Sequence, residues 1–333
     1  GGVKPNPRSG LVYEGIDLCR REKIAFILAV GGGSVMDCCK SISIAVPYDG
    51  DVWEEFWEKP GNLNFDPLPL GMIVTMPATG SEVNGSAVLT NTEKHIKTDR
   101  DYPRMNADFA LMDPTYTYSM PLRQLRAGTF DILSHIMETY FSFPIEDNVS
   151  DDISEALMKG VIRDFRKALQ NPEDYDARSN IMWEASMAEN RVIKMGKTKD
   201  FEVHNMEHQL SAYTDCNHGQ GLAVIHPALY RHLLDAGEAQ LARMAENVWG
   251  VKADSSLETV RMGIDVLESF IKEIGLPTRW SEMGITDESI LRAAADTCFI
   301  MPGCCKQLSR DEIYEILKLS LIHISEPTRL LSI

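Results

Sequence analysis

The chain has 333 residues, of which 44% are hydrophobic and 25% are charged, a composition typical of a folded globular protein. At roughly 100–200 residues per domain, this length predicts two domains. The 33 Lys and Arg residues against 49 Asp and Glu residues give a net charge of −16, which would repel nucleic-acid phosphates and anionic lipid. Neither nucleic acid nor a membrane is therefore expected as a partner. No apolar run reaches the roughly 18 residues of a membrane-spanning helix, no signal-peptide pattern opens the chain, and the seven cysteines include no CxxC pair, so a cytoplasmic protein with reduced thiols is expected.

The first third of the chain alternates strand and helix patterns. Continuous apolar runs predict strands, and the first two runs are typical of a parallel sheet that is buried on both faces. A helix is predicted over residues 35–45, ended by Pro47, and the acidic segment 48–68 predicts a loop with one exposed turn. The predicted strands are residues 24–30, 70–75, 87–90 and 109–112.

After about Thr117 the strand patterns end and amphipathic helices follow. This change predicts a domain boundary near residue 117, between an α/β domain over residues 1–117 and an all-helical domain over residues 118–319. The predicted helices are residues 125–141, 150–169, 177–192, 202–213, 255–274 and 311–319.

The last residues have an unusual pattern. Residues 319–329 (LSLIHISEPTR) resemble the translation of an adapter used to prepare sequencing libraries. We therefore expect the natural reading frame to end near Leu319 and residues 320–333 to be a non-native tail.

Three glycines separate the first predicted strand from the helix after it, in the segment 31–40 (GGGSVMDCCK). Glycines let a backbone come close to a ligand, and a helix N-terminus presents free N–H groups to a diphosphate. The pattern is neither GxGxxG nor GxxxxGK[ST], so a tight turn between strand and helix is an equal alternative. A second loop, residues 75–82 (TMPATGSE), follows the next strand, where it could hold a cofactor or simply cap the following segment.

Acidic and imidazole side chains recur at helical spacing. Asp131 and His135 are four residues apart, His204 and His208 repeat this spacing, and His218 follows. Residues four apart lie on one face of a helix, and a carboxylate with imidazoles can bind a divalent transition metal. Ordinary hydrogen-bonded histidines are the alternative interpretation of the same spacing.

Together these segments resemble the iron-dependent (group III) alcohol dehydrogenases, in particular the NAD(P)H-dependent butanol dehydrogenase branch. The resemblance covers nearly the whole chain up to about Leu319. It implies an incomplete Rossmann-like dinucleotide-binding domain followed by an all-helical metal-binding domain, and a homodimer. About 80 residues, more than one βαβ unit, are expected to be missing before residue 2, including the segment that chooses between NAD and NADP.

The resemblance also implies roles for individual residues. His208 would be a histidine near the nicotinamide and substrate that does not bind the metal. Fe(II), or alternatively Zn(II), would be bound by Asp131, His135, His204 and His218. NAD or NADP would be contacted by Gly32, Gly33, Ser34, Asp37, Thr75, Thr79, Asn84, Lys97 and Gln124.

The predicted reaction is hydride transfer between nicotinamide and a short-chain primary alcohol or aldehyde, such as butanol or butanal. The metal would stabilise the negative charge that develops on oxygen, and His208 would relay a proton. A polyol (glycerol) dehydrogenase of the same fold and a metal-binding fragment without turnover are alternatives. A hydrolytic metalloenzyme is disfavoured, since the sequence contains no HExxH.

Overall fold

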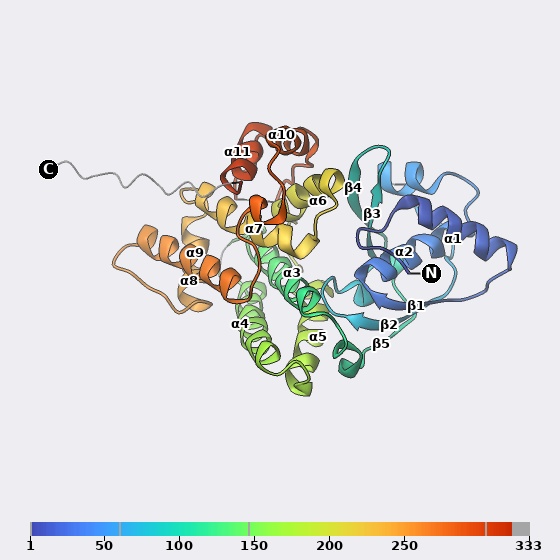
Figure 1. The fold of residues 1–333 in the computed structure, drawn as a ribbon, viewed down its shortest axis with the longest axis horizontal. Helices are drawn as coiled ribbons and strands as arrows, with labels where there is room; N and C mark the ends of the chain where they lie inside the picture. Colours follow the sequence, from blue (N-terminus) through green and yellow to red (C-terminus); the bar gives the residue numbers. More distant parts are fainter. Residues whose placement is uncertain (1, 60, 146, 304, 322–333) are drawn as a thin grey trace.

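The computed structural model of the chain describes residues 2–59, 61–145, 147–303 and 305–321. Figure 1 shows the five strands gathered at the end of the molecule that carries the N-terminus, whereas α3 to α11 form the opposite end. Most of the predicted tail, residues 322–333, lies outside the described residues.

Three strands form a parallel sheet in the order β1-β2-β5, comprising β1 (Ile27–Gly32), β2 (Leu70–Met76) and β5 (Phe109–Leu111). Helix α2 (Gly33–Ala45) follows β1, and its Met36 packs against Ala29 and Met72 in a buried cluster. The predicted parallel sheet is thus confirmed, together with its strands at residues 70–75 and 109–112, while the first strand begins three residues later than predicted.

The prediction that these strands are buried on both faces is wrong for β1. Leu28 is 47% exposed and Val30 is 54% exposed, while Leu111 of β5 is 53% exposed. These side chains belong to the face opposite α2, because they alternate with the buried Ala29 along the pleat. Within the described part of the chain, no helix covers that face.

An antiparallel hairpin accompanies the sheet, formed by β3 (Ser86–Asn91) and β4 (Ile96–Asp101). The predicted strand at residues 87–90 is confirmed as β3. Strand β4 was not predicted because Ile96 is its one apolar residue, and helix α1 (Ser9–Arg21) was not predicted either. The hairpin matters for the site because β4 carries Lys97 against the helical half.

The acidic segment 48–68 was predicted as a loop with one exposed turn, and its helical stretch is instead buried on one side. It contains a π-helical stretch, Trp53–Glu58, in which Trp53, Phe56 and Trp57 are buried while Glu54 and Glu58 face solvent. The acidic residues therefore lie on the solvent side of this short element, and its aromatic side chains belong to a buried hydrophobic cluster of the α/β half.

The remaining regular elements are helices, and the predicted helices are confirmed with ends shifted by a few residues. Polar side chains begin several of them: Asn148, Asn217 and Ser309 each accept a backbone N–H of the first turn. The helices are α3 (Leu122–Tyr140), α4 (Val149–Gln170), α5 (Tyr175–Glu189), α6 (Glu202–Thr214), α7 (His218–His232), α8 (Glu238–Asn247), α9 (Ser256–Glu273), α10 (Glu288–Thr297) and α11 (Arg310–Leu319). Short 3₁₀ turns occupy Ser81–Val83, Pro103–Met105, Pro114–Thr117 and Trp280–Met283.

Helices α7, α8 and α10 were not predicted. Helix α7 contains Gly219, Gly221 and Pro227, which all disfavour a helix in isolation. It forms because it is buried among other helices, with Leu222 and Ile225 fully inaccessible in the main core cluster. Tertiary packing here outweighs local propensity.

The last strand ends at Leu111 and the first long helix of the second half begins at Leu122. The predicted domain boundary near residue 117 lies between them and stays a prediction. Among the described helices, none combines the length and the hydropathy that crossing a membrane requires.

Candidate active site

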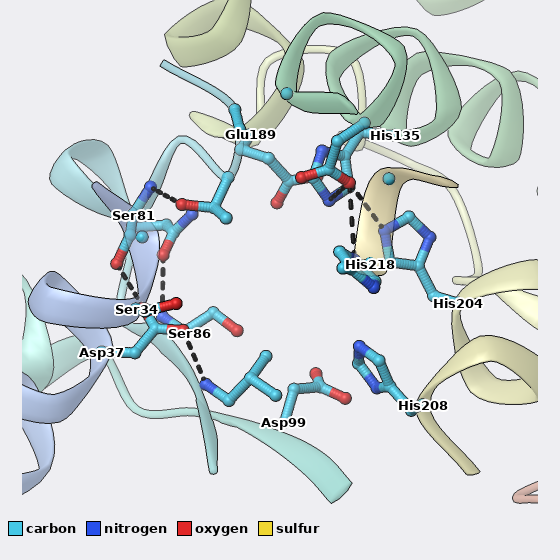
Figure 2. Close-up of a pocket in the computed structure, with 18 of the residues that line it drawn as sticks. Ser34, Asp37, Ser81, Ser86, Asp99, His135, Glu189, His204, His208 and His218 are labelled. Carbon is cyan, nitrogen blue, oxygen red and sulfur yellow. Dashed lines mark hydrogen bonds and ion pairs between the residues drawn. The ribbon is translucent and has the colours of Figure 1, made fainter. Parts of the chain in front are cut away.

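A cleft with a volume of about 710 Å³ lies between the α/β half and the helical half. Its walls carry the glycine segment after β1 on one side and the histidines of α3, α6 and α7 on the other, as Figure 2 shows. Thr75 of β2 is the predicted site residue that is not among the residues lining this cleft. The predicted residues that do line it are Gly32, Gly33, Ser34, Asp37, Thr79, Asn84, Lys97, Gln124, Asp131, His135, His204, His208 and His218.

Three helices bring the four predicted metal ligands together. Asp131 and His135 lie one turn apart on α3, His204 lies on α6, and His218 is the first residue of α7. Asp131 Oδ1 is 3.6 Å from His135 Nε2, 3.4 Å from His204 Nε2 and 3.5 Å from His218 Nε2. All three imidazoles therefore direct the same ring nitrogen toward one carboxylate oxygen.

These separations fit a divalent metal. Ligand atoms that each lie about 2.1 Å from a tetrahedral metal are about 3.4 Å from one another. Asp131 is 3% exposed and His204 is 6% exposed, yet Asp131 Oδ1 and His204 Nε2 have no hydrogen-bond partner among the described residues. Buried polar atoms without partners are costly, and a bound cation would satisfy both.

Two glutamates that were not predicted contact the Nδ1 atoms of two of these histidines, on the ring side away from Asp131. Glu138 Oε2 contacts His204 Nδ1, and Glu207 Oε2 contacts His218 Nδ1. A carboxylate at Nδ1 fixes the tautomer that leaves Nε2 free to bind a metal. Glu138 follows Asp131 by seven residues, so this spacing along one helix face was the signal available in the sequence.

Burial and neighbouring charges set the protonation of this cluster. Burial lowers the pKa of His135 to about 4, so that ring is a neutral ligand near pH 7. Burial also opposes a charge on His204, but Glu138 and Asp131 outweigh it and raise its pKa to about 10. Burial raises the pKa of Asp131, and the neighbouring His135, His218 and His204 more than reverse this and hold it low. A metal ion would replace the proton of His204 at an anionic centre.

His208 lies beside the four ligands rather than among them. Its ring centroid is 5.3 Å from that of His218 and 6.0 Å from that of His204. Burial, followed by the positive charge of Lys97, keeps the pKa of His208 well below its ordinary value. A neutral imidazole in the cleft wall can both accept and donate a proton.

The glycine segment places a helix N-terminus at the opposite wall. Gly32 precedes α2 and Gly33 is its first residue. A Cβ on Gly33 would lie 2.5 Å from Thr79 Cγ2, so glycine is required for the two predicted cofactor loops to touch. The N–H groups at the start of α2, with the adjacent Ser34, form a surface suited to a diphosphate.

Other predicted cofactor residues are engaged inside the protein. Asp37 accepts hydrogen bonds from Ser81 Oγ at 2.7 Å and from the Val88 N–H at 2.9 Å. Asn84 donates from Nδ2 to the Gly80 carbonyl at 3.0 Å. Both side chains shape the second loop, and their direct contact with a cofactor stays a prediction.

Lys40, which was not predicted as a site residue, donates hydrogen bonds to the second loop and to the residues that follow it. Its Nζ donates to Ser81 Oγ at 2.8 Å, to the Ser86 carbonyl at 2.7 Å, and to the Asn84 carbonyl and Oδ1 at 2.8 and 3.2 Å. Burial lowers the pKa of Lys40 to about 8, despite the nearby Asp37. Lys40 is fully buried, so it organises the loop rather than meeting a ligand.

Lys97 of β4 is bonded to the helical half of the molecule. Its Nζ donates to Glu207 Oε2 at 3.1 Å and to Ser211 Oγ at 3.3 Å, both on α6. Gln124 lies near the start of α3 at the cleft wall. Lys97 therefore joins the hairpin to the helix that carries His204 and His208.

Comparisons with known proteins agree with this geometry. The family model described as iron-containing alcohol dehydrogenase matches residues 1–114, and that of the Fe-containing alcohol dehydrogenase family, C-terminal, matches residues 126–321. The chain is 36% identical to NADH-dependent butanol dehydrogenase A of Clostridium acetobutylicum, over 96% of this chain and 83% of that protein. It is 35% identical to the NADPH-dependent aldehyde reductase YqhD of Escherichia coli, over 87% of this chain and 75% of that protein.

Solved structures give the same result. The crystal structure of Escherichia coli YqhD superposes with a TM-score of 0.91 at 32% identity, covering 96% of this chain and 83% of that one. That of NADH-dependent butanol dehydrogenase A from Thermotoga maritima has a TM-score of 0.90 at 30% identity, covering 96% of this chain and 82% of that one. These matches, which agree with the cleft and the four clustered candidate ligands, show that the chain belongs to the iron-containing alcohol dehydrogenase family.

Proposed function

We propose that this chain is a metal-dependent alcohol dehydrogenase or aldehyde reductase that transfers hydride between NAD(P) and a short-chain primary alcohol or aldehyde. The observation that carries the proposal is the set of four ligand atoms around Asp131 Oδ1, placed across one cleft from the glycine segment. Relatives named as butanol dehydrogenases and as an aldehyde reductase support a primary alcohol or aldehyde more than glycerol.

The chain's own residues divide the work between the two walls. Gly32, Gly33 and Ser34 would bind the diphosphate at the start of α2, which directs the nicotinamide toward the histidines. Asp131, His135, His204 and His218 would hold the divalent ion, Fe(II) or alternatively Zn(II). When bound, this ion would act as a Lewis acid toward the substrate oxygen.

Reduction of an aldehyde consumes one hydride, from nicotinamide C4, and one proton at the carbonyl oxygen. We assign the proton to His208, whose buried, neutral ring faces the same cleft as the metal ligands. The ring would relay the proton: one ring nitrogen would accept a proton from water at the cleft mouth as the N–H of the other nitrogen is donated to the developing alkoxide, so that the ring ends neutral. In alcohol oxidation the same ring would accept the proton.

The test is aldehyde reduction by the purified chain after anaerobic loading with Fe(II) or, in parallel, Zn(II). We expect NADH or NADPH oxidation that depends on butanal and is abolished by a chelator, with about one ion held per chain. Comparing the two cofactors, and butanol with glycerol, also decides cofactor preference and the polyol alternative. A chain that folds and binds no metal would contradict the proposal. The predicted homodimer is checked on the same sample by its mass in solution.

A further inference from the structure

The three candidate histidine ligands differ in the partners of their Nδ1 atoms, and one of these partners is also bonded to the other half of the molecule. The Nδ1 atom of His204 contacts Glu138 alone, whereas His135 Nδ1 has no hydrogen-bond partner among the described residues. His218 Nδ1 contacts Glu207, which in turn is bonded to Lys97 of β4. A continuous polar chain therefore connects the hairpin of the α/β half to one metal ligand.

We propose that Glu207 is a positioning residue for His218, and that Lys97 acts on the metal centre through Glu207. This inference rests on the proposed metal-dependent function. It gives Lys97 a role beyond the cofactor contact that sequence resemblance implies.

The burial of the pair supports this role. The side chain of Glu207 is fully inaccessible and that of Lys97 is 4% exposed, with Nζ 3.1 Å from Oε2. A buried carboxylate without a cation is strongly disfavoured, so Lys97 stabilises the ionised form of Glu207. An ionised Oε2 accepts the Nδ1–H of His218 and thereby leaves its Nε2 directed at Asp131, 3.5 Å away.

The remaining contacts of Lys97 keep it on α6. Its Nζ also donates to Ser211 Oγ at 3.3 Å, and its carbonyl accepts Gln209 Nε2 at 3.4 Å. Lys97 is thus bonded through both its side chain and its backbone to the helix that carries Glu207. These contacts leave its ammonium directed at Glu207 and not across the cleft toward the glycine segment.

The charges around the two supported histidines consequently differ. Glu138 accepts the Val203 N–H at 2.6 Å, and among the described residues no lysine or arginine is hydrogen-bonded to it. Glu207 shares its charge between His218 and the Lys97 ammonium, so it would pass less negative charge to a bound metal than Glu138 would. By drawing negative charge away from His218, Lys97 would make a bound metal a stronger Lewis acid.

The first test measures metal binding without cofactor or substrate. The Zn(II) dissociation constant of the full chain is determined by competition with a chromophoric chelator, and the ligand-field bands of the Co(II)-loaded chain are recorded. Glu207→Gln preserves size and removes the charge, and we expect Zn(II) binding to weaken by about 10- to 100-fold with shifted Co(II) bands. Glu155→Gln is the control, because Glu155 is also buried and bonds to Tyr140 and Arg243 rather than to a candidate metal ligand.

The second test asks whether Lys97 acts through Glu207. Lys97→Met should change the Zn(II) dissociation constant by about threefold or more in the chain that retains Glu207, and by clearly less in E207Q. Lys97→Arg should restore the parental value. A Lys97→Met variant that binds Zn(II) like the parent, and loses only affinity for NAD(P)H in a fluorescence titration, would overturn the inference.

The two proposals fail in different ways. A parent chain that folds but holds no Zn(II) contradicts the proposed function, whereas tight Zn(II) binding that is unchanged by Glu207→Gln contradicts only the role of Glu207. If E207Q does not fold, as judged by circular dichroism, Lys97→Met decides alone. Its Co(II) bands must then move relative to those of the parent, and unmoved bands reject the role of Lys97.

Discussion

On the α/β side of the cleft the buried polar groups satisfy one another: the Lys40 ammonium donates to Ser81, Asn84 and Ser86, and Asp37 accepts from Ser81. On the helical side, Asp131 Oδ1 and His204 Nε2 are equally buried, yet within the described ranges no partner satisfies them. The polar groups named on the α/β wall have hydrogen-bond partners within the protein, whereas the two atoms named on the helical wall would gain a partner only from a bound cation. We therefore expect cofactor binding to depend on shape, and metal binding to depend on individual donor atoms.

The largest effect should come from removing one donor on the helical side. His204→Ala deletes a ligand and leaves Asp131 with one neighbour fewer, so we expect loss of stoichiometric metal. Because the ion would contribute several kcal/mol to the reaction, turnover should fall by about a thousandfold. Metal analysis and steady-state aldehyde reduction measure both. His232→Ala, a histidine outside the cleft lining, is the control, and a metal-bound, active H204A would refute the ligand assignment.

The matching change on the α/β side is Lys40→Met. It removes four hydrogen bonds and leaves Asp37 buried without a nearby ammonium. We expect a loss of about 3 kcal/mol in the free energy of unfolding, with weaker NAD(P)H binding and unchanged metal affinity. Urea unfolding and fluorescence titration measure these. Lys94→Met, at an exposed ion pair with Glu58, should change stability little. Weaker metal binding by K40M would contradict the expectation that the α/β wall affects only cofactor binding and stability.

A smaller effect is expected at His208, which faces the metal ligands without being one. His208→Asn should retain bound metal and NAD(P)H but lower the turnover number by about a hundredfold, as for loss of a general acid. The pH dependence of turnover should change at the same time, since the proton must then come from water. Unchanged turnover and pH profile would show that His208 is only part of the wall.

The smallest effect on turnover is expected at Glu184, a buried residue outside the cleft lining, where the expected change is one of stability. Burial, and then the nearby Asp164, raise the pKa of Glu184 to about 8. A carboxyl group whose pKa is raised in the folded state destabilises the fold as pH rises from its unfolded value, near 4.5, toward 8. Glu184→Gln should therefore be more stable than the parent at pH 8, by at most about 1.4 kcal/mol for each pH unit in that window.

Urea unfolding at pH 5 and at pH 8, in the presence of a chelator, measures this difference. The exposed Glu173→Gln serves as the control, because it removes a carboxylate without removing a buried one. Equal stability of E184Q and the parent at both pH values would contradict the assignment.

Helical spacing marked the region of the proposed metal centre, and resemblance to a family then selected the four candidate ligands within it. Asp131 and His135, like His204 and His208, are four residues apart, and this pattern survives in any amphipathic helix that forms there. Glu138 lay within the same pattern and was overlooked. The role of Glu207 was not predicted, because a glutamate next to a histidine in a helix ordinarily faces solvent.

Less of the cofactor wall could be predicted, since its residues were chosen by resemblance and not by contact. Asp37, Asn84 and Lys97 line the cleft, but their polar atoms bond to the protein itself. Thr75 lies in β2 outside the cleft lining. Which partner a polar side chain takes depends on the strand or helix that faces it, and a single sequence contains no record of that.

The sequence by itself determined the parallel strands and most of the helices, because local hydrophobic period encodes them, and helical spacing marked the cluster from which resemblance selected the four candidate ligands. Only the tertiary structure decided that β4 pairs with β3, that α7 forms despite Pro227, and that Lys97 meets Glu207 across 110 positions of chain. Those features depend on packing between distant segments, and packing energy is a property of the assembled fold rather than of any stretch within it.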